Sequence, residues 1–313
     1  MSYVKPAELV TRMVDAGAYK MQLSARDTLI RAFMGAALLT MAAAFAVTVS
    51  TNTGQPLLGA LLFPVGFVIL YLFGFDLLTG VFTLTPLAVL DKRPGATVGA
   101  MFRNWGLVFL GNFGGAFMVA ILMAIYFTYG FSTEPSAVGH AISEIGHART
   151  VGYADHGAAG MLTLFIRGVL CNWMVSTGVV LSMVSDNVVA KIVAMWLPIM
   201  LFFYMGFEHS IVNMFLFPSG LLLGADFTIM DYLIWNEIPT VIGNLVGGLL
   251  FVGLPLFITY GRTTRRTRAA RAVVTQDVPA DAPSTAEHSA ARPIVQPVFA
   301  PGASTAREPV GIA

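Results

Sequence analysis

The sequence predicts an all-α integral membrane protein with six transmembrane helices, arranged as two halves of three helices in opposite orientation. Three observations support this fold class. Hydrophobic residues make up 56% of the chain, charged residues only 11%, and the mean hydropathy is +0.75, a composition unlike that of soluble domains. Long uncharged runs have the length of membrane spans. The second and fifth spans are interrupted at matching motifs.

The uncharged runs set the positions of the spans. No Asp, Glu, Lys or Arg occurs from Ala32 to Phe75. Because about 20 residues cross a bilayer, this run predicts two crossings with a turn at residues 50–55. The second crossing is expected to continue past an interruption to about Leu90. The other crossings are expected near 105–128, 161–184, 190–218 and 238–260.

Two interruptions reveal an internal repeat. The stretches Gly74–Thr79 and Gly206–Ile211 each place an acid, Asp76 or Glu208, inside an apolar run. Such an acid is costly in a bilayer and indicates a functional site. A Gly-Asn pair follows each stretch after 37 residues, since 111 − 74 and 243 − 206 are equal. The chain is therefore predicted to be a duplicated unit of three spans, and an odd number of spans gives the halves opposite orientation.

Charge placement predicts the orientation of the spans. Lys and Arg gather before the first span, between the second and third, and after the sixth, and these residues favour the cytoplasmic side. Both termini are therefore expected to be cytoplasmic, in a bacterial inner membrane. The loops expected on the opposite side carry Arg149 as their one Lys or Arg, with Arg167 near the start of the fourth span.

The predicted domains are a cytoplasmic amphipathic helix at 1–26, a transport domain at 27–261 and a basic collar with a disordered tail at 262–313. The repeat halves are placed at about 27–130 and 161–261. Cys171 is the one cysteine, so no disulfide forms within the chain, and no His, Cys and carboxylate cluster has metal-ligand spacing. No metal, cofactor or nucleic acid is expected as a partner.

The interruptions point to a pathway through the membrane, because unpaired backbone groups survive there only where protein buries them or a cavity wets them. Asp76 and Glu208 precede the second half-helices, so they are interpreted as caps that accept bonds from backbone N–H groups. Thr79 either bonds back to its own helix or lines the pore. His209 is the strongest functional candidate, because imidazole changes charge near neutral pH.

Each of the other polar residues has a purely structural interpretation as well as a functional one. Asn172, Asn213 and Asn236 either connect helices by hydrogen bonds or support the path. Asn213 follows His209 by four residues and so shares its helical face. The two Gly-Asn motifs are interpreted as sites of close helix packing.

The residues resemble one known family, the formate/nitrite transporters, over about residues 3–260. The most specific matching segments are Asp76-Leu77-Leu78-Thr79, Cys171-Asn172-Trp173-Met174-Val175, Gly206–Phe215 and Ile238–Asn244. The resemblance implies an aquaporin-like fold and a homopentamer in which each protomer has its own pore. It also implies passage of small monovalent anions of weak acids across the lipid bilayer.

The matching motifs imply roles for individual residues. Thr79 and His209 would form the central hydrogen-bonding pair, with Asn172 as a neighbour that fixes the site. The hydrophobic constrictions and the residues that flank the path would be Leu78 with Val175, Phe67 with Phe202, and Asn213 with Asn236.

One position departs from the family. Most members carry a Lys in the extracytoplasmic vestibule, sixteen residues before the Asn of span four, and here that position is His156. A fixed positive charge that gathers anions is therefore missing or dependent on pH, unless Arg149 of the same loop replaces it.

The leading hypothesis is a passive or proton-coupled channel for formate or nitrite, in which the His209 and Thr79 site relays a proton to the anion. Hydrosulfide, acetate and lactate are related alternatives. A neutral-solute channel of the aquaporin kind is a second hypothesis. A membrane enzyme or a scaffold for a soluble partner is a third, and the sequence offers no catalytic constellation for it.

Overall fold

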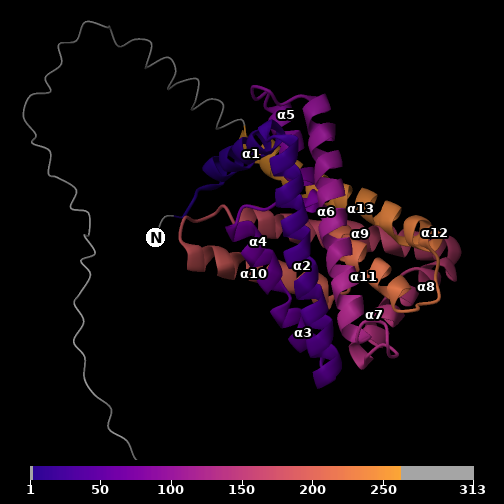
Figure 1. Ribbon diagram of the computed structural model, residues 1–313. Coiled ribbons are helices and arrows are strands. Elements are labelled where there is room, and N and C mark those ends of the chain that lie inside the picture. The colour runs from indigo at the N-terminus through magenta and orange to yellow at the C-terminus, as the bar shows by residue number, and fades with distance from the viewer. Residues whose placement is uncertain (1–2, 262–313) are drawn as a thin grey trace, which may run out of the picture. The chain divides into compact units, whose positions relative to one another are not determined.

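A computed structural model of the protein describes residues 3–261, which are mostly helical (Figure 1). These residues belong to the first of two units into which the chain divides, Met1–Ala269. The predicted collar and tail, 262–313, lie outside the described residues.

The elements follow one another in this order: α1 (Pro6–Gln22), α2 (Ala25–Thr53), α3 (Pro56–Leu62), α4 (Pro64–Leu72), α5 (Leu78–Leu90), α6 (Val98–Phe127), α7 (Ala137–Ala148), α8 (Val151–Ala154), α9 (Gly157–Leu181), α10 (Val188–Tyr204), α11 (Ser210–Leu222), α12 (Ile229–Tyr232), the π-helix η1 (Leu233–Glu237), α13 (Ile238–Gly248) and the π-helix η2 (Leu249–Gly253).

Within residues 3–261, four continuous helical stretches are long and apolar enough to cross a membrane: α2, α6, α9 and Ile229–Gly261. Shorter apolar helices come in two consecutive pairs, Pro56–Leu72 with Leu78–Leu90 and Val188–Tyr204 with Ser210–Leu222. The gaps within these pairs fall at the two predicted interruptions, so both breaks are confirmed.

The breaks begin with glycines whose backbone favours a turn. Gly74 has φ +72° and Gly206 has φ +64°, a region that residues with a Cβ atom rarely enter. The chain then becomes extended, at Leu77 with φ −118° and at His209 with φ −114°, before α5 and α11 start. The same turn chemistry therefore forms both breaks.

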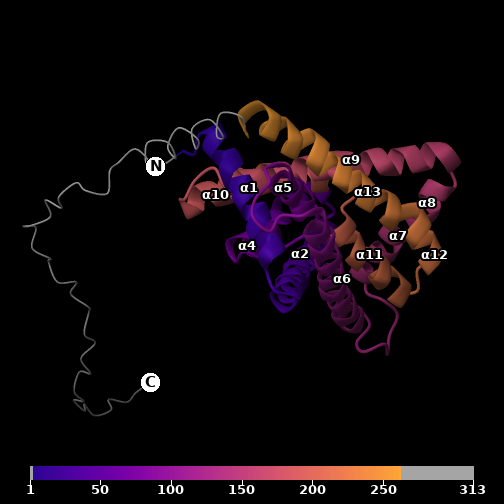
Figure 2. The ribbon, with the colours of Figure 1, turned by 90° about the horizontal axis from the view of Figure 1, so that it is seen from above.

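Two pairs of helices pack side by side, α2 with α6 and α9 with α13 (Figures 1 and 2). Each pair lies next to one of the two breaks. A Cβ atom on Gly111 would lie 2.8 Å from the carbonyl oxygen of Leu29, and one on Gly243 would lie 2.7 Å from that of Phe165. The two Gly-Asn motifs therefore do allow close helix packing.

The surface helix α1 packs against α5, closely enough that a Cβ atom on Gly17 would lie 2.2 Å from the carbonyl oxygen of Leu84. The Val4 amide donates to the carbonyl of Val184 over 2.9 Å, and Arg12 donates to Asp186 over 2.8 Å. Helix α1 is thus fastened to the segment between α9 and α10.

The segment between α6 and α9 was expected to be a loop and instead contains the helices α7 and α8. Ser136 caps α7 by accepting a bond from the Gly139 amide. Val138 and Ile142 are buried, and α7 packs against α11 and α2. These short helices position Arg149 and Tyr153 beside the second break.

Candidate functional site

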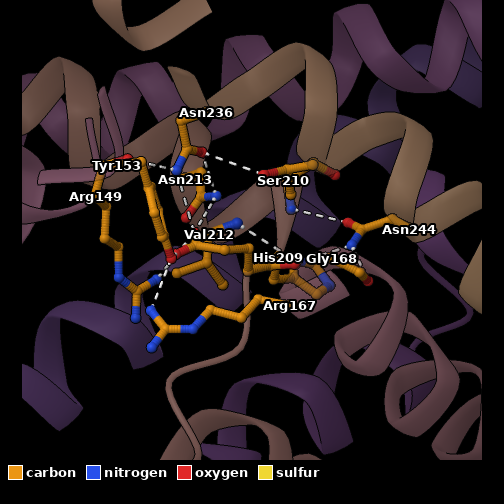
Figure 3. Close-up of polar contacts among 12 residues, drawn as sticks. Arg149, Tyr153, Arg167, Gly168, His209, Ser210, Val212, Asn213, Asn236 and Asn244 are labelled. Carbon is orange, nitrogen blue, oxygen red and sulfur yellow. Dashed lines mark hydrogen bonds and ion pairs between the residues drawn. The ribbon is translucent and has the colours of Figure 1, made fainter. Parts of the chain in front are cut away.

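The two breaks meet at Thr79 and His209. The Thr79 Oγ1 and His209 Nε2 atoms lie 3.4 Å apart, and both side chains are almost completely buried. His209 Nδ1 accepts a bond from the Val212 amide over 3.3 Å (Figure 3). Because Nδ1 acts as an acceptor, the proton of a neutral imidazole resides on Nε2 and is directed at the Thr79 oxygen. The pair that the family resemblance implies is therefore within hydrogen-bonding distance.

The caps of the half-helices are asparagines. Asn112 Oδ1 accepts a bond from the Leu78 amide over 2.9 Å, and Asn244 Oδ1 accepts one from the Ser210 amide over 3.0 Å (Figure 3). His209 also caps α11 through its ring nitrogen. The Gly-Asn motifs thus do more than pack: they satisfy the first amides of α5 and α11.

The prediction that Asp76 and Glu208 are caps is wrong. Asp76 forms an ion pair with Lys20, which reaches it from α1. The carboxylate of Glu208 accepts bonds only from side chains. Neither carboxylate accepts a bond from the amides that it was expected to cap, and side-chain donors bind each of them instead.

Glu208 is the centre of a buried charge cluster, and its partners Arg149, Tyr153 and Asn213 are labelled in Figure 3. The Tyr153 hydroxyl donates to its Oε1 over 2.8 Å, and Arg149 donates to its Oε2 over 3.4 Å. Arg167 in turn donates to the Tyr153 oxygen over 2.8 Å. Glu208 has no exposed side-chain area, so these partners replace the water that a carboxylate requires.

Asn213 and Asn236 serve the same carboxylate. Asn213 Nδ2 donates to Glu208 Oε2 over 2.9 Å and to Asn236 Oδ1 over 2.7 Å. Asn236 Nδ2 donates to the carbonyl of Arg149 over 2.9 Å. These two asparagines hold Glu208 and Arg149 in place, and neither lines the cavity that reaches His209.

Asn172 joins the two breaks. Its Nδ2 donates to the carbonyl of Thr79 over 3.1 Å and to the carbonyl of Asn244 over 2.6 Å. Its Oδ1 accepts a bond from the Ser176 hydroxyl over 3.2 Å. A single side chain from α9 therefore contacts the first break and the residue that caps the second.

A cavity of about 480 Å³ ends at the histidine. Arg149 and Glu144 line it along α7, Phe202 lines it from α10, and His209 lines its inner end. The ring of Phe202 stacks on that of His209 at 5.5 Å between centroids. Thr79 does not line this cavity, so of the central pair His209 is the member that reaches it.

Of the four predicted constriction residues, Phe202 lines this cavity, whereas Phe67, Leu78 and Val175 are buried and do not line it. The ring of Phe67 lies 4.4 Å from that of Tyr71 between centroids. Phe67, Leu78 and Val175 are therefore part of the buried apolar core.

Residues 7–258 match the family description of the formate/nitrite transporters. The chain belongs to this family. Its relatives are channels and transporters rather than enzymes. The chain is 37% identical to a probable formate transporter of Methanothermobacter thermautotrophicus over 63% of its own length and 73% of that protein. It is 30% identical to the formate channel FocA of Escherichia coli K12, over 82% and 94% of the two chains.

Solved structures show the same fold. An FNT family ion channel superimposes with a TM-score of 0.68 at 22% identity, covering 80% of this chain and 98% of the other. A pentameric formate channel with formate bound superimposes with a TM-score of 0.62 at 24% identity, covering 75% and 97%.

His156 occupies the position where most family members carry the vestibule lysine, and Arg149 was the alternative cation. In the structure these two residues line different cavities. Arg149 lines the cavity that ends at His209. His156 lines a different cavity of about 440 Å³, together with Tyr153 and Arg167. Of the two candidates, Arg149 thus lines the cavity that His209 also lines, and its guanidinium is ion-paired with Glu208 there.

Several contributors to the site were not predicted from the sequence, namely Lys20, Tyr71, Asn112, Tyr153, Arg167 and Asn244. The equal spacing of the Gly-Asn pairs was the available signal for the two asparagines. Lys20 and Tyr153 belong to segments read as a surface helix and a loop. Among residues 3–261, no group of three or more His, Cys, Asp or Glu side chains could hold a metal ion.

Proposed function

We propose that the protein is a proton-coupled channel for formate and nitrite, with His209 and Thr79 as the central pair. The observation that supports this most directly is the cavity that ends at the hydrogen-bonded pair. Relatives named as formate channels or transporters support the substrate class. A family that carries small weak-acid anions fits a site at which an imidazole lies beside a hydroxyl group, at the end of a cavity lined by Arg149.

The mechanism follows from desolvation. A bare anion that passes the apolar side chains beyond the central pair loses its hydration, which costs many kcal/mol, whereas the neutral acid loses far less. Arg149 draws the anion into the cavity. At its inner end the anion takes a proton that comes from a hydronium ion of the entry side and is relayed through His209. One ring nitrogen gains a proton as the other gives one up, so the imidazole stays neutral and no hydroxide is left behind. The neutral acid then passes Thr79 and releases the proton on the other side.

The proposal includes the membrane topology. Six spans in an inverted three-plus-three arrangement account for four long helices and two interrupted ones. The matching bonds of Asn112 and Asn244 support the repeat. Both termini are cytoplasmic in a bacterial inner membrane. The protein assembles as a homopentamer, by analogy with the solved structure described as a pentameric formate channel.

The test compares formate and nitrite flux in liposomes that contain the wild type, His209→Phe or His140→Phe. His140 is exposed on α7, so the same substitution there controls for general damage. In liposomes that contain the wild type, flux should rise when the compartment to which the anion is added is made acidic. His209→Phe should abolish this pH response. Wild-type flux in His209→Phe would contradict the proton role. Flux that ignores pH in the wild type would favour a neutral-solute channel.

A further inference from the structure

A second cavity lies at the other end of α9 from Arg149. It has a volume of about 90 Å³ and is lined by Tyr71, Leu72, Ser182, Lys191 and Met195. Helix α9 begins beside α8 and ends at Leu181, next to Ser182. Its 25 residues cover about 37 Å at 1.5 Å per residue. The small cavity and the cavity lined by Arg149 therefore lie near opposite ends of α9.

Lys191 brings an unneutralised positive charge to this small cavity. Its side chain is half-buried, and no carboxylate among residues 3–261 pairs with it within 4 Å. Asp186 lies near it on the preceding loop, but both oxygens of that carboxylate accept bonds from Arg12, over 2.8 and 3.3 Å. The ammonium thus has donors available for an anion.

Tyr71 supplies a second donor. Its hydroxyl makes no hydrogen bond within residues 3–261, whereas the Ser182 hydroxyl donates to the carbonyl of Val179 over 2.6 Å. A free phenol O–H and an ammonium that line the same small cavity are the donors that a carboxylate or nitrite prefers. The serine oxygen is left as an acceptor only, so it is not part of the proposed contact.

Tyr71 also connects this cavity with the central pair. A Cβ atom on Gly80 would lie 2.4 Å from the Tyr71 oxygen and 3.6 Å from Val179. Gly80 follows Thr79 directly in the first turn of α5. The hydroxyl of Tyr71 therefore stands between the small cavity and the half-helix that carries Thr79.

We propose that Lys191 and Tyr71 form a binding site for the transported anion on the side of the membrane opposite Arg149. This inference rests on the proposed function, because it concerns the same anion. The volume suits it: about 10–15 Å³ is enough for one water molecule, so the cavity accommodates a three-heavy-atom anion. The ammonium supplies charge, and the phenol directs the anion toward Thr79.

The experiment measures formate flux against formate concentration in vesicles with the protein in one orientation, with formate added on the Lys191 side. Lys191→Gln should raise the half-saturating concentration about tenfold and Tyr71→Phe about threefold, since a charge-assisted bond contributes more than a neutral one. Lys191→Arg should restore most of the loss. Lys92→Gln, which removes an exposed lysine, controls for net charge.

A second measurement needs no transport. Binding of ¹³C-formate to the detergent-solubilised protein, followed by line broadening, should weaken in Lys191→Gln and Tyr71→Phe but not in Lys92→Gln. The inference is overturned if Lys191→Gln and Tyr71→Phe match Lys92→Gln in both measurements. Failure of the wild type to carry formate would instead contradict the proposed function, and the binding measurement would still decide for or against the site.

Discussion

Asn112 and Asn244 make the same three hydrogen bonds in the two halves of the chain. Each Oδ1 accepts the first amide of a half-helix, at Leu78 or Ser210. Each Nδ2 donates to the carbonyl of the acid in its break, over 3.0 Å at Asp76 and 2.9 Å at Glu208. The third bond goes to the long helix behind, over 2.7 Å at Ala32 and 2.8 Å at Gly168. One amide thus satisfies three backbone groups that a broken helix leaves open.

Replacing either asparagine by alanine should destabilise the protein by a similar amount. Asn112→Ala and Asn244→Ala each leave buried backbone groups unpaired, at about 1–3 kcal/mol for each group. Thermal unfolding in detergent, followed by circular dichroism, should show matching falls in Tm. Asn187→Ala, which removes an exposed cap of α10, should cost only about 1 kcal/mol. Equal effects in all three variants would contradict the proposed importance of the buried bonds.

Substitutions at Gly74 and Gly206, the glycines that begin the breaks, test the effect of backbone conformation separately from that of side-chain packing. An added Cβ on Gly74 meets no atom within 4 Å, and one on Gly206 meets only Arg149 Nη2 at 3.9 Å. Gly74→Ala and Gly206→Ala should therefore cost about 1–2 kcal/mol through the positive φ angle alone. Gly106→Ala has equal space on the helix α6 and should stabilise by about 0.5–1 kcal/mol. Tm measurements decide, and a stabilised Gly74→Ala would show that φ is not constrained there.

Removing the buried acid should be more damaging. Glu208→Ala leaves Tyr153, Arg149 and two asparagines without their shared acceptor, and breaking a buried ion pair costs about 3–5 kcal/mol. Glu144→Ala removes an exposed acid that lines the cavity ending at His209, and it should change stability by less than about 0.5 kcal/mol. Yield and Tm in detergent report the difference. Similar values for the two variants would mean that Glu208 is dispensable.

The vestibule charge can be tested through ionic strength. Arg149→Gln should lower formate flux at low salt about three- to tenfold, because a cation in a cavity raises the local anion concentration. The loss should shrink at high salt, where such attraction is screened. His156 lines the cavity that contains Tyr153 and Arg167 instead, so His156→Gln should leave flux unchanged. A larger loss in His156→Gln would reverse the assignment.

The attachment of α1 should depend on acid pH. The hydrogen bond from Arg12, reinforced by its charge, lowers the pKa of the Asp186 carboxyl below its ordinary value of 3.8. A lowered pKa stabilises the folded contact above pH 3.8, and this contribution disappears as the pH falls through the lowered value. The protection factors of the α1 amides, which correct for the pH dependence of intrinsic exchange, should therefore be equal at pH 7 and pH 5 and should fall below pH 3.8.

Asp186→Asn should remove that pH response, because asparagine has no charge to lose. Asp155→Asn, an exposed acid before α9, should retain it. Because the pair is exposed, its effect should also weaken in high salt. If α1 exchanges identically in the wild type and Asp186→Asn below pH 3.8, this ion pair does not hold the helix.

The sequence predicted the features that depend on local pattern. Uncharged runs located the long helices, and the repeated Gly74 and Gly206 motifs located both breaks. The caps were mispredicted because their partners are distant: Asn112 lies 34 residues from Leu78, and Lys20 lies 56 residues from Asp76. Helix α7 escaped prediction because its buried face, at Val138 and Ile142, is short.

The matched contacts reach beyond the predicted halves into α1 and into α7 with α8. The Asp76 amide donates to the carbonyl of Arg31, as the Glu208 amide does to that of Arg167. Each of these arginines also donates to a tyrosine hydroxyl, over 3.1 Å at Tyr19 and 2.8 Å at Tyr153. The two short surface segments are thus counterparts, and each carries a tyrosine and a base for one break.

The two halves match in these contacts but not in every side chain. When Arg31 is aligned with Arg167, the residue that matches Asn172 is Ala36. Alanine has no amide group, so Ala36 cannot make the bonds by which Asn172 joins the two breaks. A substitution at Asn172 therefore removes a connection for which the first half has no counterpart at the matching position.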